Sequence, residues 1–324
     1  MRAALLLPLL TCLAAGAEKP RVFILTDISN EPDDEMSLVR YLVYSNEFDT
    51  EGLVATTSVW LRDRTRPDLI ARTVDAYAKV RPNLLLHAQG YPDAADLKAV
   101  IRAGSDQFGI AGVGPGKLSE GAKLLLAAAS KPDPRPLWVP VWGGANTLAQ
   151  ALDHARRSLP AAELERLVSK LRVYTISDQD DAGKWLRDQF PRLQYIVSPS
   201  TVDNKDYYLA TWTGIGGDRR YRNGPGEDFH LVENPWLDSN VRQDHGPLGA
   251  LYPRIAYIME GDTPSYLNLI PNGLASDQDP SWGGWGGRYV VRQSYGESRP
   301  IYTNSRDTVH TRDGMFHTSN TATV

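Results

Sequence analysis

The sequence predicts an α/β protein built on a mostly parallel sheet with helices on both faces. Three short apolar runs, at 21–26, 51–57 and 136–142, have the length and composition of buried strands. Segments whose apolar residues recur at helical spacing, at 32–48 and 66–80, alternate with them. This alternation is typical of parallel sheets, because the helix that links two parallel strands covers one face of the sheet.

The alternation of strand and helix patterns continues to residue 198 and then stops. Between 211 and 250 the chain is rich in Gly, Trp, Tyr, Asp and Asn and shows little periodicity. Long irregular segments in compact proteins are usually functional loops or disordered, and the many aromatic residues favour ordered loops. We expect a last strand at 254–260, followed by a Gly- and Trp-rich loop at 279–287. With no internal repeat and no low-complexity linker, the pattern predicts one domain.

Composition and charge exclude some classes of function. The 324 residues are 42% hydrophobic and 23% charged, with a formal net charge of −4. These values are ordinary for a globular protein with a sizeable core. Proteins that bind nucleic acid contact its phosphates through clustered Lys and Arg, and the sequence has no such cluster. We therefore expect no nucleic-acid partner.

Residues 1–17 have the three parts of a secretory signal peptide: a basic residue, an apolar stretch and small residues at 15–17. The apolar stretch is too short to cross a bilayer, which takes about 20 residues. The only cysteine, Cys12, lies inside this segment, so the mature chain is expected to lack thiol chemistry. We expect cleavage after residue 17 and a secreted or periplasmic product without a membrane span.

The most informative stretch is FILTDISNEPDDEM at 23–36. Asp27 follows the first strand, and Asp33 and Asp34 begin the next helix. In open parallel α/β sheets, ligands bind beyond the carboxyl ends of the strands. Carboxylates that converge there repel one another unless a cation such as Ca²⁺ neutralises them. Acidic residues are also favourable at a helix start, so the motif alone leaves both interpretations open.

This stretch resembles the N-terminal signature of the nucleoside hydrolases, in which aspartates hold Ca²⁺ and activate a water molecule. The resemblance implies that Asp27 and Asp34 are Ca²⁺ ligands and that Asp33 accepts a proton from the attacking water. The family usually has another Asp two residues after the first one. This chain has Ser29 there, which puts one metal ligand in question.

Two later segments extend the resemblance. VPVWGGANTLAQAL at 139–152 is similar to the family's strand and Gly-rich turn, and it implies that the carbonyl of Asn146 completes the Ca²⁺ shell. The family also has a late Asp after a strand, and Asp262 takes that role here, with Glu260 the other candidate. The alternatives are that Asn146 only caps a helix and that Gly-Asp-Thr-Pro is only a turn.

Four separated motifs indicate a narrower family. TDISNEPDDEMSLVRYL, YTISDQDDAGKWL, HGPLGALYP and PSWGGWGGRY are similar to the nucleoside-hydrolase-like domain of a bacterial cellulose-binding protein family. The resemblance implies a nucleoside-hydrolase-like α/β domain at 18–300. Members usually continue into a small β-sandwich domain, so the polar segment at 301–324 is expected to be a truncated linker to such a domain.

Further residues are expected around the substrate. His245 is a candidate for protonating the leaving group, although a lone histidine is more often structural. Tryptophans spaced by glycines suit the C–H faces of sugars, although buried packing explains them equally. The acidic run at 177–183 forms either a polar rim of the pocket or the capped start of a helix. The expected substrate contacts are Asn30, Glu31, Asp178, Trp282 and Trp285.

Two functions from different classes follow. The first is a Ca²⁺-dependent hydrolase that cleaves an N-glycosidic or other glycosidic bond of a nucleoside or glycan, by attack of water on the anomeric carbon. The second is a non-catalytic carbohydrate-binding module, directed at cellulose, that keeps the pocket without turnover. Ser29 favours the module, whereas the Asp33–Asp34 pair favours the hydrolase.

Overall fold

The structure is a computed structural model, and it describes residues 18–29, 31–198, 229–256, 258–294, 296–305, 308–310 and 316–318. The expected signal peptide at 1–17 and the expected substrate contact Asn30 lie outside these residues. In the described part of the chain, no helix is both long enough and apolar enough to cross a membrane.

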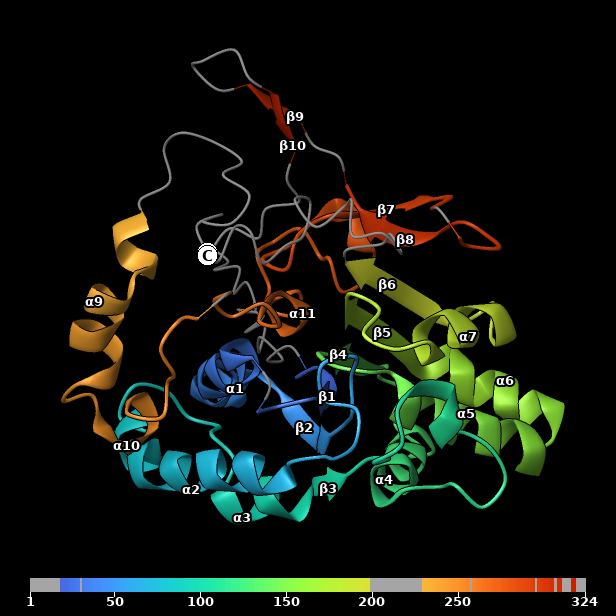
Figure 1. The fold of residues 1–324 in the computed structure, drawn as a ribbon, viewed down its shortest axis with the longest axis horizontal. Coiled ribbons are helices and arrows are strands. Elements are labelled where there is room, and N and C mark those ends of the chain that lie inside the picture. Colours follow the sequence, from blue (N-terminus) through green and yellow to red (C-terminus); the bar gives the residue numbers. More distant parts are fainter. Residues whose placement is uncertain are drawn as a thin grey trace, which may run out of the picture.

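An eight-stranded sheet forms the centre of the molecule (Figure 1). The strands of this sheet are β1 (Arg21–Thr26), β2 (Asp49–Ala55), β3 (Ile101–Ala103), β4 (Leu137–Val141), β5 (Leu171–Ile176), β6 (Gln194–Ser198), β7 (Tyr289–Arg292) and β8 (Ile301–Asn304). Their order is β3-β2-β1-β4-β5-β6-β8-β7, and only β7 and β8 pair antiparallel. This arrangement confirms the predicted mostly parallel sheet. A separate antiparallel pair is formed by β9 (Thr308–His310) and β10 (Phe316–Thr318).

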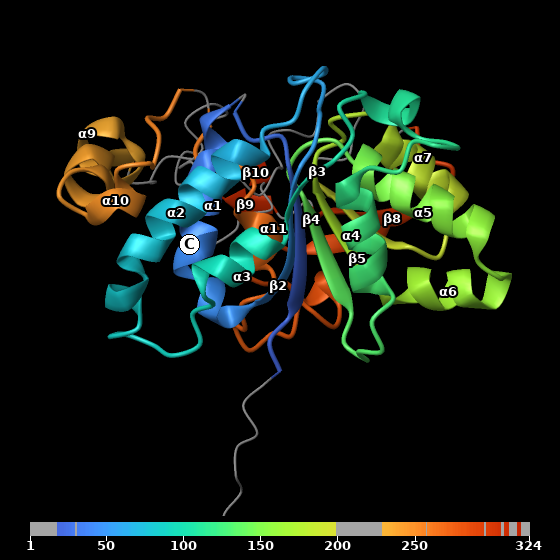
Figure 2. The ribbon, with the colours of Figure 1, turned by 90° about the horizontal axis from the view of Figure 1, so that it is seen from below.

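Helices cover both faces of the sheet, which Figure 2 shows nearly edge-on. The helices are α1 (Pro32–Val43), α2 (Pro67–Leu84), α3 (Ala94–Ala99), α4 (Glu120–Ala129), α5 (Asn146–Ser158), α6 (Ala161–Lys170), α7 (Ala182–Gln189), α9 (Asn234–Leu237), α10 (Gly246–Gly249) and α11 (Pro264–Leu267). Shorter turns are η1 (Ser45–Glu47), η2 (Gly109–Gly112), η4 (Phe229–Val232), η5 (Asp238–Arg242) and η6 (Pro280–Trp282). One hydrophobic core joins the sheet to α1, α2, α3 and α11, and the other joins it to α4, α5, α6 and α7.

The late part of the chain differs from the sequence-based expectation in two ways. No strand forms among the described residues of 254–260. The side chain of Asn234 instead binds the backbone of Ile255, accepting from its N–H at 2.9 Å and donating to its C=O at 3.1 Å. The last strand of the main sheet is β8 instead, paired between β6 and β7. The α/β unit therefore continues to Asn304, past the boundary expected at residue 300.

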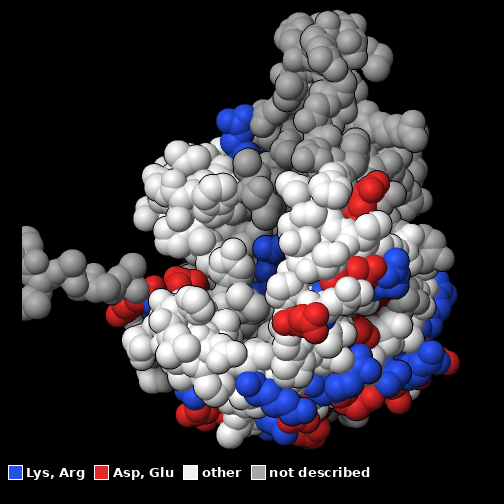
Figure 3. Space-filling model, turned by 90° about the vertical axis from the view of Figure 1, so that its left-hand side faces the viewer, with Lys and Arg blue, Asp and Glu red and all other residues white. Residues whose placement is uncertain are grey.

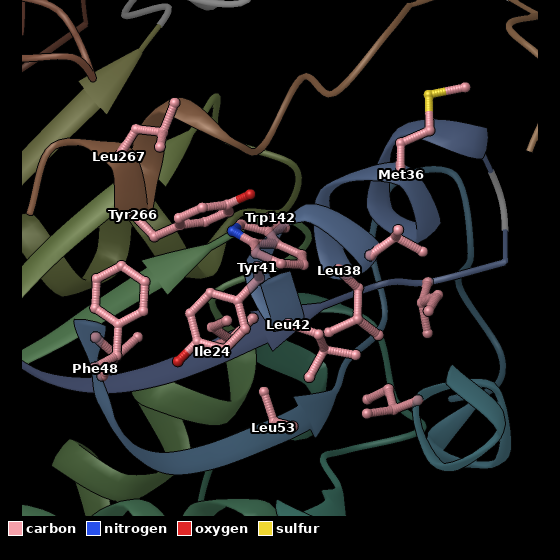
Figure 4. Close-up of a cluster of buried hydrophobic side chains, with 14 of the residues drawn as sticks. Ile24, Met36, Leu38, Tyr41, Leu42, Phe48, Leu53, Trp142, Tyr266 and Leu267 are labelled. Carbon is pink, nitrogen blue, oxygen red and sulfur yellow. The ribbon is translucent and has the colours of Figure 1, made fainter. Parts of the chain in front are cut away.

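Aromatic packing fixes α11 against α1 and the sheet (Figure 4). The rings of Tyr41 and Phe48 stack with their centroids 5.2 Å apart, and Tyr266 meets Tyr41 edge-on at 5.2 Å. Trp142, just after β4, donates a 2.9 Å hydrogen bond from Nε1 to Oγ of Ser265. These buried contacts set the position of the segment that leads into α11.

A buried ion pair holds the same segment to α1. Nε and Nη2 of Arg40 donate to the carboxylate of Glu260, the second at 3.0 Å, and the Glu260 side chain is only 1% exposed. The carboxylate also accepts hydrogen bonds from the hydroxyls of Tyr252, at 2.6 Å, and Thr263, at 3.1 Å. One turn earlier on α1, Ser37 lies 3.1 Å from the hydroxyl of Thr263. The helix and the 260–266 segment are thus joined by polar contacts as well as by packing.

On the side of the molecule seen in Figure 3, acidic and basic residues alternate along the lower rim. Surface pairs of this kind, such as Arg72 with Glu35 at 3.2 Å, contribute little to stability because water screens them. The buried pair between Arg40 and Glu260 belongs to a different class, because loss of one partner leaves an uncompensated charge in the interior.

We therefore expect Arg40→Ala to lower the free energy of unfolding by about 2 kcal/mol, somewhat less than is usual for a fully buried pair because the Arg40 side chain is 27% exposed. Arg72→Ala is the matched control, since it removes an exposed ion pair from the same side of the sheet, and its effect should stay within about 0.5 kcal/mol. Urea denaturation of both variants measures the difference. Equal effects would contradict a special role for the buried pair.

Candidate metal centre

Four buried aspartates gather at the carboxyl end of β1. Asp27 is the first residue after the strand, and Asp33 and Asp34 lie in the first turn of α1. Asp262 comes from the turn that precedes α11. All four are between 1% and 7% exposed. Pro32 begins α1, which suits a proline because the first helical turn needs no N–H donor, and the helix dipole favours the carboxylates that follow.

Three of these carboxylates are spaced so that they can hold one cation. One oxygen each from Asp33, Asp34 and Asp262 lies within 4.8 Å of the others. Among the residues that the structure describes, Oδ1 of Asp33, Oδ2 of Asp262 and Oδ1 of Asp27 have no hydrogen-bond partner. Buried polar atoms are nearly always paired, so three such carboxylate oxygens at one place are consistent with a bound cation. An all-oxygen set of carboxylates fits a hard divalent cation such as Ca²⁺.

Two glycines allow the backbone to approach the carboxylates closely. A Cβ atom on Gly261 would lie 2.6 Å from Oδ2 of Asp33, and one on Gly143 would lie 2.6 Å from Oδ1 of Asp27. Both distances are too short for any real side chain. Gly143 belongs to the Gly-rich turn between β4 and α5, so this turn lies directly against the first aspartate.

Burial raises the pKa of every carboxyl in the group. Loss of hydration raises the pKa of Asp27 to about 6, and loss of hydration together with nearby negative charge raises that of Asp33 to about 8. The pKa values of Asp34 and Asp262 lie well above the usual range, first because of burial and then because of the neighbouring aspartates. The four groups therefore need either protons or a cation to remain together.

The structure arranges the predicted ligands in a slightly different way from the sequence-based assignment. That assignment made Asp27, Asp34 and Asp262 the ligands and Asp33 the proton acceptor. The tight group contains Asp33 in place of Asp27, although the charge of Asp27 raises the pKa values of the other three. Asp34 is fixed by a hydrogen bond that Thr26 donates to its Oδ1. The division of roles among the four stays a prediction.

Asn146 lies in a separate polar network at the start of α5. Its Nδ2 donates to Oγ1 of Thr57 at 2.9 Å and to the carbonyl of Gln107 at 2.8 Å. Its backbone N–H donates to Oδ2 of Asp180 at 3.0 Å. The turn before it contacts Asp27 through Gly143, and ligation by the Asn146 carbonyl stays a prediction.

Asp180 is a buried acid within the run at 177–183, from which only Asp178 was singled out as a site residue. Its Oδ1 accepts from the N–H of Ala182 at 3.0 Å while its Oδ2 accepts from Asn146, so one carboxylate caps the starts of both α7 and α5. Burial raises its pKa to about 7, against the opposing effect of these bonds. The expected contact Asp178 pairs instead with Arg187 at 2.6 Å. The signal that was available is an Asp two residues before a helix start.

The other expected residues are distributed around the molecule. The charge of Glu31 helps to raise the pKa of Asp33, after burial, which places Glu31 beside the acidic group. His245 is exposed, with Nε2 3.1 Å from the carbonyl of Ser239, just before α10 at the margin of the molecule (Figures 1 and 2). Trp282 and Trp285 are 53% and 37% exposed, so neither is buried in the core.

The raised pKa values predict how stability depends on pH. Because the folded carboxyls titrate above their ordinary value of 3.8, the native state binds more protons than the unfolded state between about pH 4 and pH 8. In the presence of a chelator, the free energy of unfolding should therefore fall as the pH rises through this range, by about 5 kcal/mol between pH 5 and pH 8 from Asp27 and Asp33 together. Urea denaturation at several pH values measures it. Asp33→Asn should flatten the curve, and a stability that rises with pH would contradict the prediction.

Comparison with known proteins confirms the resemblance seen in the sequence. The family model described as "Cellulose-binding Sde182, nucleoside hydrolase-like domain" matches residues 21–289. A similar solved structure is a nucleoside hydrolase-related hypothetical protein from Saccharophagus degradans that is described as associated with carbohydrate metabolism. It is 38% identical with a TM-score of 0.74, over 89% of this chain and 67% of that one. A comparison with curated proteins found no match. The chain therefore belongs to the cellulose-binding Sde182 family, as its nucleoside hydrolase-like domain.

Proposed function

We propose that this protein is a Ca²⁺-dependent hydrolase that cleaves an N-glycosidic or other glycosidic bond of a carbohydrate ligand. One observation carries the proposal: carboxylates from two segments distant in sequence meet in the interior, and several of their oxygens have no partner among the described residues. Burial of like charges is costly and contributes nothing to the fold, so a function in ion binding explains it better than a structural role.

The aspartates have different roles in the proposed reaction. Asp34 and Asp262, with Asp27 beside them, would hold the cation. Bound Ca²⁺ supplies a template that orients a water molecule and the sugar hydroxyls. Asp33 would accept a proton from this water as the water oxygen attacks the anomeric carbon, while the glycosidic bond breaks and the leaving group takes a proton from solvent. The positive charge of a bound cation would lower the raised pKa of Asp33 and keep it ionised for this role. The negative charge of the surrounding aspartates would stabilise the oxocarbenium-like transition state.

The relatives support the class of ligand and the place of action. The nucleoside hydrolase-like fold supports hydrolysis at an anomeric carbon, and the cellulose-binding family description supports a carbohydrate. We also propose that the protein acts outside the cytoplasm, as a secreted or periplasmic product, because the composition of residues 1–17 is that of a signal peptide.

A non-catalytic carbohydrate-binding module is the second candidate, and Ser29 favours it. This residue stands where nucleoside hydrolases usually have an additional Asp, and its φ of 110° is rare for a residue with a side chain. The loop between β1 and α1 therefore keeps an unusual conformation without the extra carboxylate. In this second proposal, the centre binds a sugar and releases it unchanged.

Two asparagine variants separate binding from chemistry. Asp33→Asn should lower the rate of sugar release at least about 100-fold, because the proton acceptor is lost, while Ca²⁺ affinity changes less than tenfold. Asp34→Asn should lower both the rate of sugar release and the Ca²⁺ affinity, because it removes a ligand of the cation. Calorimetric titration with Ca²⁺ and an assay of reducing sugar from nucleosides and glycans measure the two effects. Full activity of Asp33→Asn would rule out its role as the base.

A pull-down on insoluble cellulose, with and without EDTA, separates the hydrolase from the module. For the hydrolase, we expect retention on cellulose to fall with EDTA, since the cation positions the sugar, and sugar to be released only in the presence of Ca²⁺. If retention on cellulose is the same with and without EDTA, and no sugar is released from any glycan or nucleoside, the module is favoured and the enzymatic proposal is overturned.

A further inference from the structure

Trp60 is an exposed aromatic residue in the loop that follows β2. Its residue surface is 58% exposed, and the preceding Val59 is 36% exposed. Among the described residues, its indole ring stacks on no aromatic ring and lies under no guanidinium group; the nearby Arg62 covers Phe108 instead, 4.5 Å from the ring centroid. A large apolar side chain therefore faces solvent in this loop.

The loop that carries Trp60 is held firmly by hydrogen bonds. Oγ of Ser58 accepts from the N–H of Trp60 at 3.0 Å and from that of Leu61 at 3.1 Å. The N–H of Val59 donates to the carbonyl of Gln179 at 2.6 Å, and Nε2 of Gln179 donates in turn to the carbonyl of Trp142. The loop is thus tied to the segments that follow β4 and β5, and its exposed indole stands on a fixed backbone.

Backbone contacts place Trp60 next to the acidic centre. At the start of its loop, the N–H of Thr56 donates to the carbonyl of Thr26 at 2.7 Å, directly before Asp27. Ser58 is fully buried, and its side chain lowers the pKa of Asp27 against the larger effect of burial. Two peptide units separate Ser58 from Trp60, so their Cα atoms are at most about 7.6 Å apart. In Figure 2 the light-blue segment after β2 rises beyond the carboxyl ends of the strands, on the side where the aspartates lie.

We infer that Trp60 is a stacking subsite for a sugar ring, adjacent to the unit held at the acidic centre, so that the ligand is a glycan of two or more units. This inference rests on the proposed carbohydrate function. A flat indole complements the C–H face of a sugar ring, and a rigid aromatic platform loses little conformational freedom when it binds. The carboxylates then contact the hydroxyls of one unit while Trp60 supports the next.

The experiment is calorimetric titration of glucose, a β-1,4-linked glucose tetramer and adenosine into the Ca²⁺-loaded full chain. Trp60→Ala should weaken binding of the tetramer about tenfold and leave glucose and adenosine unchanged. Trp60→Phe should retain most of the affinity, because the ring remains. Leu86→Ala is the matched control, since Leu86 is 83% exposed at the end of α2, and it should bind as the wild type does.

Each outcome bears on the inference. If the wild type binds the tetramer and Trp60→Ala binds it equally well, the subsite is refuted while the carbohydrate function stands. If Trp60→Ala loses adenosine affinity as strongly as tetramer affinity, the indole holds a nucleobase and the glycan subsite is refuted. If the wild type binds neither glucose nor the tetramer, the proposed carbohydrate function and the subsite fail together.

Discussion

The mutual repulsion of four buried aspartates is the constraint around which this molecule is organised. Asp27, Asp33, Asp34 and Asp262 are each almost inaccessible to water, and each raises the cost of ionising the others. Only protons or a bound cation can offset that cost. A fold that assembles such a group must therefore obtain its stability elsewhere, and it must hold the carboxylates in place against their own repulsion.

The fold does so by joining two elements that are far apart in sequence. The carboxyl end of β1 and the first turn of α1 present three of the aspartates, and the turn before α11 presents the fourth. Successive turns of α1 then contact the same late segment: Ser37 meets Thr263, and Arg40 meets Glu260. The aromatic cluster around Tyr266 buries the rest of the contact. One helix thus contributes both to the acidic group and to the contacts that hold it together.

Much of this arrangement was predictable from the sequence, because it depends on local patterns. The alternation of strands and helices gave the parallel sheet, and the Asp-Asp pair after a strand and a proline gave the centre of the site. Asp262 was found from its place in the family motif, although the strand expected before it does not form. Asn234 binds both backbone groups of Ile255 from 21 residues away, and no local pattern records such a contact. Asp180 was not singled out, since its bond to Asn146 spans 34 residues of sequence. Trp60 was not singled out, because the sequence alone does not show that its side chain is exposed.

The order of the strands has a consequence for how such a protein can diversify. β6 and β8 are neighbours and run parallel, with Ile196 opposite Tyr302, yet a hundred residues of chain separate them. That intervening stretch includes Asp262, Glu260, which pairs with Arg40, and the Gly- and Trp-rich loop at 279–287. The chain between the end of β6 and the start of β8 is therefore one contiguous segment whose two ends lie on adjacent strands. Exchange of that segment between genes would replace Asp262 and the loop at 279–287 together and leave the first six strands of the sheet unchanged.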